Sequence, residues 1–420
     1  MSRYRYRRLN WRHSGLHPEK DTIACPDCGL VQRLPPSRPK TVIECARCEH
    51  RLTRATRVGI EAPLAFSAAG LTLLLPAALM PLMSLVSFGI QRQNWLPTGV
   101  GALWRDGFNA VAALIFLFSI GIPFLYLGIL VWVLGSLQLR AGARLGRLFR
   151  WAVELRPWAM TEVYLVGCCV AYTRLQDVGN VHVGVGGWCL MGATLAVLVA
   201  GITLDESVVW DAMPYHGEAW VPSARSIGCD TCDLLLPARQ IGAPCPRCGT
   251  RLRRRKSDTL ARTLALVIAG FVLYLPANLL PVLDIERFGH DQPNTILTGV
   301  RELIAAGLWP LAIVVFAASI VVPLMKLCGL SLMLAMTHRR SGRWLFGRTL
   351  LYRFIDFIGR WSSIDLFMIS ILVALVQFGA LTRVKPEGGA MAFAAVVVIT
   401  MFASRCFDPR VMWDRAARIS

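Results

Sequence analysis

Eight of the 13 cysteines in this 420-residue chain fall into four Cys-X-X-Cys pairs, which form two quartets. Two such pairs present four thiolates at the corners of a tetrahedron, the donor set of a structural zinc ribbon. A redox dithiol also uses Cys-X-X-Cys, but it needs one pair rather than two and lies in a thioredoxin-like context that is absent here. We therefore expect two structural zinc ions, held by Cys25, Cys28, Cys45 and Cys48 and by Cys229, Cys232, Cys245 and Cys248.

A second group of residues is notable because it is polar within apolar sequence. Lys326 is the only one of the five lysines inside a hydrophobic run, and a lysine deep in a membrane costs several kcal/mol unless it is paired or hydrated. Ser319 lies seven residues earlier on the same helical face, and Asp365 opens the next run as a counter-charge. Thr400 and Asn278 could complete a polar transport cluster. The alternative is that Lys326 snorkels to the interface and Asp365 caps its helix.

The elements that must position these residues are membrane helices. The chain is 55% hydrophobic with a mean hydropathy of +0.50, and its long apolar runs indicate a polytopic membrane protein. Each run is long enough to cross about 30 Å of hydrocarbon as a helix. The eight runs lie at roughly 58–82, 108–137, 159–178, 183–204, 261–283, 308–336, 362–381 and 389–405.

The runs and the cysteine quartets alternate, which divides the chain into five segments. The expected fold is all-α, with two tandem four-helix transmembrane repeats, each preceded by a small zinc ribbon. The predicted segments are a first ribbon at 1–57, a first transmembrane domain at 58–204, a second ribbon at 205–260, a second transmembrane domain at 261–406 and a tail at 407–420.

The two halves are a duplication in parallel orientation. Residues 269–281 repeat residues 69–81 with 8 of 13 positions identical, at an offset of 200 residues. The differences are as informative as the identities, because Ala78 becomes Asn278 and Tyr126 becomes Lys326. We therefore expect the polar site in the second half only.

The distribution of charge predicts the orientation in the membrane. The formal net charge is +19, and the basic residues lie in blocks between alternate runs. By the positive-inside rule, the Arg-rich loops, both ribbons and both termini face the cytoplasm. The basic block at residues 251–256 would permit nucleic-acid binding, but inside-positive bias and anionic lipid account for it, so we expect no nucleic-acid partner.

Three motifs, together with the order of ribbons and runs, resemble the paraquat-inducible protein A family over nearly the whole chain. They are Leu-Pro-Ala-Asn-Leu-Leu-Pro at 275–281, Pro-Leu-Met-Lys at 323–326 and Arg-Trp-Ser-Ser-Ile-Asp at 360–365. The resemblance implies a multi-pass subunit of the bacterial inner membrane. It further implies that the subunit passes phospholipid to or from a periplasmic partner built of mammalian-cell-entry (MCE) domains.

Three functions remain open at this point. The first is a lipid transporter, with protonation of Lys326 and Asp365 as the coupling step. The second is a passive anchor or adaptor for the MCE partner, and the third is a membrane-bound zinc-ribbon regulator. The chain contains no Gly-Lys pair, and therefore no P-loop, and it contains no HExxH or GxSxG motif, so we do not expect an enzyme.

Overall fold

The computed structural model describes residues 22–34, 42–54, 59–87, 90–139, 145–176, 179–213, 226–287, 290–376 and 382–417. Parts of the predicted ribbon segments and tail, namely residues 1–21, 35–41, 55–57, 214–225 and 418–420, lie outside these ranges. The described part is mostly helical, as predicted.

Both transmembrane domains contain the same elements in the same order, which confirms the tandem repeat. The first consists of α1 (Glu61–Leu79), β5 (Met83–Ser87), β6 (Ile90–Asn94), α2 (Leu96–Arg105), α3 (Asn109–Phe116), the π-helical turn η1 (Leu117–Gly121), α4 (Ile122–Gln138), α5 (Leu145–Leu155), the 3₁₀ turn η2 (Arg156–Trp158), α6 (Thr161–Leu175), β7 (Asn180–Val183), α7 (Val185–Thr203) and α8 (Glu206–Ala212). The second consists of α9 (Thr259–Leu279), β10 (Leu283–Arg287), β11 (His290–Asn294), α10 (Ile296–Ala305), α11 (Trp309–Phe316), the π-helical turn η4 (Ala317–Val321), α12 (Val322–His338), α13 (Leu345–Ile358), the 3₁₀ turn η5 (Gly359–Ser363), α14 (Ile364–Leu375), β12 (Thr382–Pro386), α15 (Gly388–Cys406) and α16 (Arg410–Ala417).

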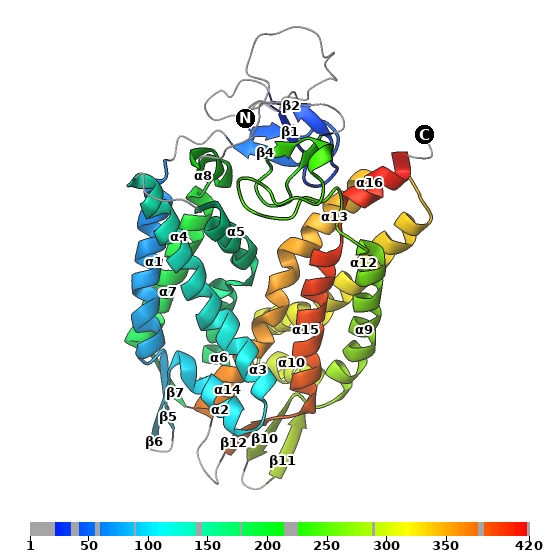
Figure 1. Ribbon diagram of the computed structural model, residues 1–420. Coiled ribbons are helices and arrows are strands. Elements are labelled where there is room, and N and C mark those ends of the chain that lie inside the picture. The colour runs from blue at the N-terminus through cyan, green and yellow to red at the C-terminus, as the bar shows by residue number, and fades with distance from the viewer. Residues whose placement is uncertain are drawn as a thin grey trace.

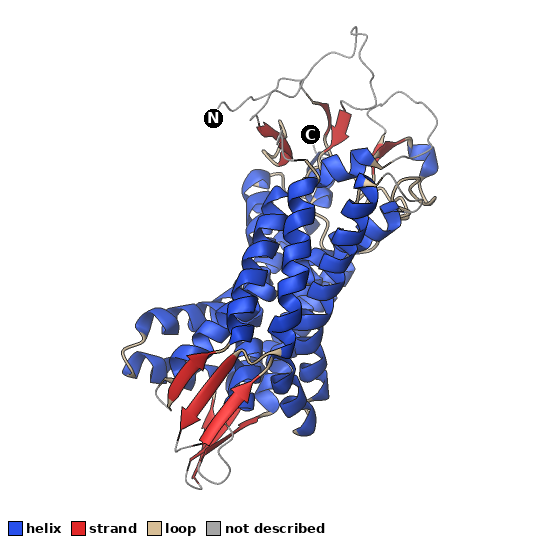
Figure 2. Ribbon diagram, turned by 90° about the vertical axis from the view of Figure 1, so that its left-hand side faces the viewer, coloured by secondary structure: helices blue, strands red, loops and turns tan. Residues whose placement is uncertain are grey.

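The two ends of the helical bundle carry different structures. At one end each repeat forms a three-stranded antiparallel sheet, in the orders β6-β5-β7 and β11-β10-β12. Both cysteine segments and α16 lie together at the opposite end (Figure 1), and the view from the side shows the same separation (Figure 2). The cysteine segments contain the short strands β1 (Thr22–Ala24), β2 (Val31–Arg33), β3 (Val42–Glu44), β4 (Arg51–Arg54), β8 (Ile227–Gly228) and β9 (Leu235–Leu236), and the 3₁₀ turn η3 (Ala238–Gln240).

The third crossing of each repeat differs from the prediction. Seven helices in the described ranges are long and apolar enough to span a membrane. Helix α6 has only 15 residues and α14 only 12, which correspond to about 22 and 18 Å of helix. In the second repeat, α13, η5 and α14 together make one broken helix from Leu345 to Leu375. We expected a cytoplasmic loop before residue 362, because arginines such as Arg348 and Arg353 interrupt the apolar pattern there; the structure shows that they lie on a helix.

The two repeats meet through their third helices. Helix α6 packs against α14, where Gly167 leaves room for Phe367, and the Tyr164 ring meets the Phe367 ring edge-on at 5.2 Å. Helix α2 of the first repeat also packs on α14, with Gly99 against the Ser370 backbone. The break between α13 and α14 therefore lies beside the centre of the molecule rather than at its rim.

Candidate functional site

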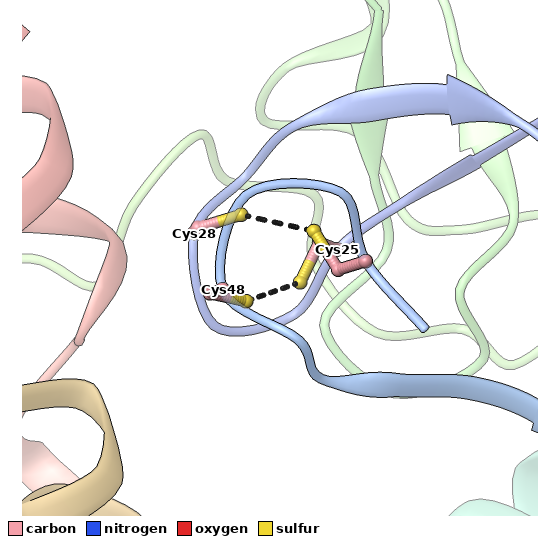
Figure 3. A group of neighbouring side chains, drawn as sticks. Cys25, Cys28 and Cys48 are labelled. Atoms are coloured by element: carbon pink, nitrogen blue, oxygen red, sulfur yellow. Dashed lines mark hydrogen bonds between the residues drawn. The ribbon is translucent and has the colours of Figure 1, made fainter. Parts of the chain in front are cut away.

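The eight predicted metal ligands form two compact clusters. Within each quartet all four sulfurs lie within 4.8 Å of one another. The sulfur of the first cysteine is 3.4 Å from that of the fourth, and the sulfur of the second is 3.6 Å from that of the third. Figure 3 shows how the side chains of Cys25, Cys28 and Cys48 converge. A tetrahedral zinc with bonds of about 2.3 Å separates its sulfurs by about 3.8 Å, so the residues present fit such an ion.

The backbone around each Cys-X-X-Cys pair explains why the thiols converge. In all four pairs the residue after the second cysteine donates its N–H to the carbonyl of the first. That residue has a positive φ in every case, and it is Gly29, Glu49, Asp233 or Gly249, with φ of 69°, 55°, 53° and 74°. Two of the four are glycine, which adopts this left-handed conformation without strain. The two pairs of the second quartet are separated by 12 residues, against 16 in the first quartet, and this shorter loop leaves the geometry unchanged.

The second ribbon is held to α16 by charged contacts. Arg410 Nη1 lies 2.8 Å from Asp230 Oδ1 of the ribbon, and its Nε and Nη2 each donate to Asp408 at 2.9 Å. Burial opposes the charge on both groups, but the hydrogen bonds from Arg410 hold the pKa of Asp408 below its ordinary value and raise that of Arg410. Asp408 therefore remains a carboxylate at neutral pH.

The Lys326 ammonium is fully buried and hydrogen-bonded inside the second domain. Its Nζ donates to Thr400 Oγ1 at 2.9 Å and to the Gly359 carbonyl at 3.2 Å. Thr400 donates its own hydrogen to the Val397 carbonyl at 3.0 Å, which leaves its oxygen free to accept. Since Gly359 directly follows α13, the ammonium also sits at the negative end of that helix dipole. Lys326 therefore does not snorkel to the interface.

Asp365 lies at the other side of the same helix break, in the first turn of α14. It is 4% exposed, and its Oδ2 is hydrogen-bonded to Ser319 Oγ, whereas its Oδ1 has no partner in the part of the chain that the structure describes. Ser319 Oγ also donates to the Val315 carbonyl at 2.7 Å, as Ser119 does to Ile115 in the first repeat. The carboxylate thus faces the positive end of the α14 dipole.

The predicted pairing of Lys326 with Asp365 is not what the structure shows. Across the described ranges no hydrogen bond or ion pair joins them, and each charge instead complements one end of the broken helix. The acidic group that interacts electrostatically with Lys326 is Asp356 of α13, and the basic group that interacts with Asp365 is Arg174 of α6. The reason for the difference is the break itself, which supplies each charge with its own partners.

Asn278 lies apart from the other four predicted residues. Its side-chain amide donates to the Tyr274 carbonyl at 2.8 Å, on its own helix, and within the described residues no hydrogen bond links it to Lys326 or Asp365. Its part in the site stays a prediction. Gly359 was missed, although a glycine between two apolar stretches is a signal for such a break.

A π-helical turn places Ser319 toward Asp365. Pro323 has no N–H and cannot donate to the Ser319 carbonyl four residues back, so the helix widens and Val322 N–H donates to Ala317 instead. The first repeat has the same turn around Ser119. At the other positions its residues differ: it has buried Tyr126 for Lys326, Glu162 for Asp365 and Val197 for Thr400.

Comparison with known proteins identifies the family. The model of the paraquat-inducible protein A family matches residues 60–214 and 260–417. The chain belongs to this family. It is 33% identical to the intermembrane transport protein PqiA of Escherichia coli over 411 residues, which are 95% of this chain and 97% of that protein. It is 31% identical to the lipophilic envelope-spanning tunnel protein A of E. coli (94% and 92% covered) and 28% identical to a probable intermembrane transport protein of Haemophilus influenzae (94% and 96% covered). No solved structure gives a significant match.

Proposed function

We propose that this member of the family is the inner-membrane subunit of a lipid-transport system, which passes phospholipid between the inner membrane and a periplasmic MCE-domain partner. Relatives named for intermembrane transport and for an envelope-spanning tunnel support this proposal, as do the helices long and apolar enough to span a membrane. The observation that carries it is the buried Lys326 ammonium at a broken helix.

A passive anchor would have no use for such a residue. A charge within the membrane is costly and marks a functional site by default, and helices broken at mid-membrane are typical of transporter binding sites. Here the Lys326 ammonium and the Asp365 carboxyl lie on either side of one break, and each is hydrogen-bonded to a buried protein hydroxyl. This arrangement supports a transporter over an adaptor.

The hydrogen bonds of Ser319 suggest how a proton could enter the cycle. Its hydroxyl carries one hydrogen but contacts two acceptors, the Val315 carbonyl and Asp365 Oδ2. If the Ser319 hydroxyl donates its hydrogen to the Val315 carbonyl, Asp365 must be protonated in order to donate to the Ser319 oxygen. If the hydroxyl turns to an ionised Asp365, the Val315 carbonyl loses this hydrogen bond from Ser319. The pair therefore has two states that differ by one proton on Asp365, while Lys326 lies across the helix break with hydrogen-bond partners of its own.

The proposed orientation places the ribbons in the cytoplasm and the sheets in the periplasm, where the partner would meet them. The Arg-rich segments between alternate runs support it. The ribbons would hold one zinc each, and with four sulfurs per ion these sites would stabilise the fold rather than take part in transport chemistry.

Matched variants in the two repeats test the proposal. We expect Lys326→Ala and Asp365→Asn to abolish lipid transfer in reconstituted membranes and in cells, with normal abundance and retained copurification of the MCE partner. The first-repeat controls Tyr126→Ala and Glu162→Gln should have milder effects. Full transfer with Lys326→Ala would contradict a transport role for the site, and loss of partner binding alone would favour the anchor.

A further inference from the structure

Each cysteine ribbon contacts the repeat that it does not precede, and the second ribbon also contacts α16 of the repeat that follows it, through Asp230 and Arg410. The second ribbon packs on the first repeat, where Gly146 of α5 lies against the Arg247 carbonyl and Arg247 Nη2 is 3.6 Å from Asp211 of α8. The first ribbon packs on the second repeat, where the Arg47 guanidinium lies 4.9 Å from the Trp413 ring of α16. The first metal cluster is therefore attached to the domain that contains Lys326.

Arg353 of α13 makes the closest contact between this ribbon and the membrane domain. Its Nε lies 2.6 Å from Asp27 Oδ2, and its Nη2 donates to the Cys48 carbonyl at 3.0 Å. Nη2 also lies 3.4 Å from Cys48 Sγ. Asp27 belongs to the first Cys-X-X-Cys pair and Cys48 to the second. One guanidinium can therefore reach both pairs only while the cluster holds them together.

The same helix leads directly to the Lys326 ammonium. Gly359, whose carbonyl accepts from Lys326 Nζ, follows Arg353 by six residues, or about 9 Å at helical rise. Trp413 Nε1 donates to Thr349 Oγ1 at 3.2 Å and fixes the start of α13 to α16. The position of the Gly359 carbonyl is thus set by a helix whose other end is tied to the first cluster.

The first repeat lacks this connection. The residue that corresponds to Arg353 is Arg150 of α5, which lies 3.6 Å from Glu154 on its own helix. The position of Asp27 in the second quartet is occupied by Thr231, which has no charge to pair with an arginine and contacts Thr250 instead. Among the described residues, this contact of Arg353 with the ribbon, which we call the brace, is found in the repeat that has a buried lysine and not at Arg150 of the other.

We propose that Arg353 is a positioning residue, through which the metal-loaded first cluster holds α13 and the Gly359 carbonyl in place for Lys326. Release of the metal frees the two Cys-X-X-Cys pairs to separate, and α13 then loses its anchor. The consequence for transport rests on the function proposed above, whereas the mechanical link does not.

Hydrogen exchange of the full-length protein in nanodiscs, with metal content measured on the same samples, tests the link. We expect Arg353→Ala to keep both metals and to raise amide exchange across residues 355–363 by roughly tenfold, because a bidentate contact to charged groups is lost. Cys25→Ser, which removes a ligand of the first cluster, should raise exchange in the same segment. Arg353→Lys should restore part of the protection, and the control Arg150→Ala should leave residues 355–363 unchanged.

Three results would overturn the proposal: wild-type exchange in Arg353→Ala, an equal increase in Arg150→Ala, or loss of the first metal in Arg353→Ala, which would make Arg353 a support for the cluster rather than its reporter. The exchange readout does not depend on lipid transfer. If Lys326→Ala transports normally while the exchange results are as expected, the brace stands and the proposed function fails.

Discussion

Replacement of Thr400 with Val removes one of the two acceptors of the Lys326 ammonium and nearly preserves the shape of the side chain. Both residues are fully buried, and their hydrogen bond is 2.9 Å long. A hydrogen bond to a charged group contributes about 1.5–3 kcal/mol, and neither group is exposed to solvent. We expect Thr400→Val to lower the free energy of unfolding by about this amount. The first repeat already has Val197 at this position, where no ammonium needs an acceptor.

A double-mutant cycle isolates the contribution of this contact. In a Lys326→Met background the Thr400 hydroxyl bonds only the Val397 carbonyl, so Thr400→Val should cost about 1 kcal/mol or less. The coupling energy, measured by denaturant titration of the purified protein in detergent, should then exceed about 0.5 kcal/mol. An equal cost in both backgrounds would show that Thr400 does not hold the ammonium and would refute our account of the site.

Further predictions concern the two ends of the molecule. Metal analysis should return about two zinc ions per chain bound to thiolate, and Cys→Ser at any ligand should reduce protein abundance more than transport per molecule; disulfides without metal would exclude the zinc sites. Cysteines introduced at Gln91 and Gln292 should react with an impermeant reagent in cells with a permeabilised outer membrane, and labelling of the ribbons there would reverse the orientation. The pKa of Asp408 is held below its ordinary value, so its contribution to stability is complete above about pH 4 and is lost as the pH falls through the folded value. We therefore expect Asp408→Asn to lower the apparent Tm by the same amount at pH 7 and at pH 5. The difference in Tm between Asp408→Asn and the wild type should vanish in stronger acid.

Much of the architecture follows from local sequence patterns. The cysteine spacings predicted both clusters, because ligands that are close in sequence need only a short turn to converge. The apolar runs and the 200-residue repeat predicted the duplicated helical domains. In the structure Ser119 and Ser319 occupy equivalent positions in the two repeats, as do Tyr126 and Lys326. Lys326 and Thr400 were grouped in the predicted polar cluster, and the structure shows a hydrogen bond between them, whereas the part of this cluster in transport stays a prediction.

What the sequence did not predict depends on tertiary contacts. Helix α13 contains Arg348 and Arg353, which make it look like a loop on hydropathy alone. One of these arginines is buried and the other binds the distant first ribbon. The docking of the first ribbon on the second repeat joins residues 326 apart in the chain, Asp27 and Arg353, and no periodic signal marks such a contact.

The two repeats differ in the residue that follows the helix before the break. Helices α5 and α13 end at equivalent residues, Leu155 and Ile358, and the three additional residues of α13 lie at its start. The Gly359 carbonyl, directly after α13, accepts from Lys326 Nζ at 3.2 Å. The corresponding residue in the first repeat is Arg156, whose side chain instead pairs with Glu206 at 2.8 Å. A buried ammonium at position 126 would also face Val197, where Lys326 has the Thr400 hydroxyl. Lysine is stable in the second repeat because the Thr400 hydroxyl and the Gly359 carbonyl both accept from it, whereas the first repeat has Tyr126 at this position and Val197 offers no hydroxyl.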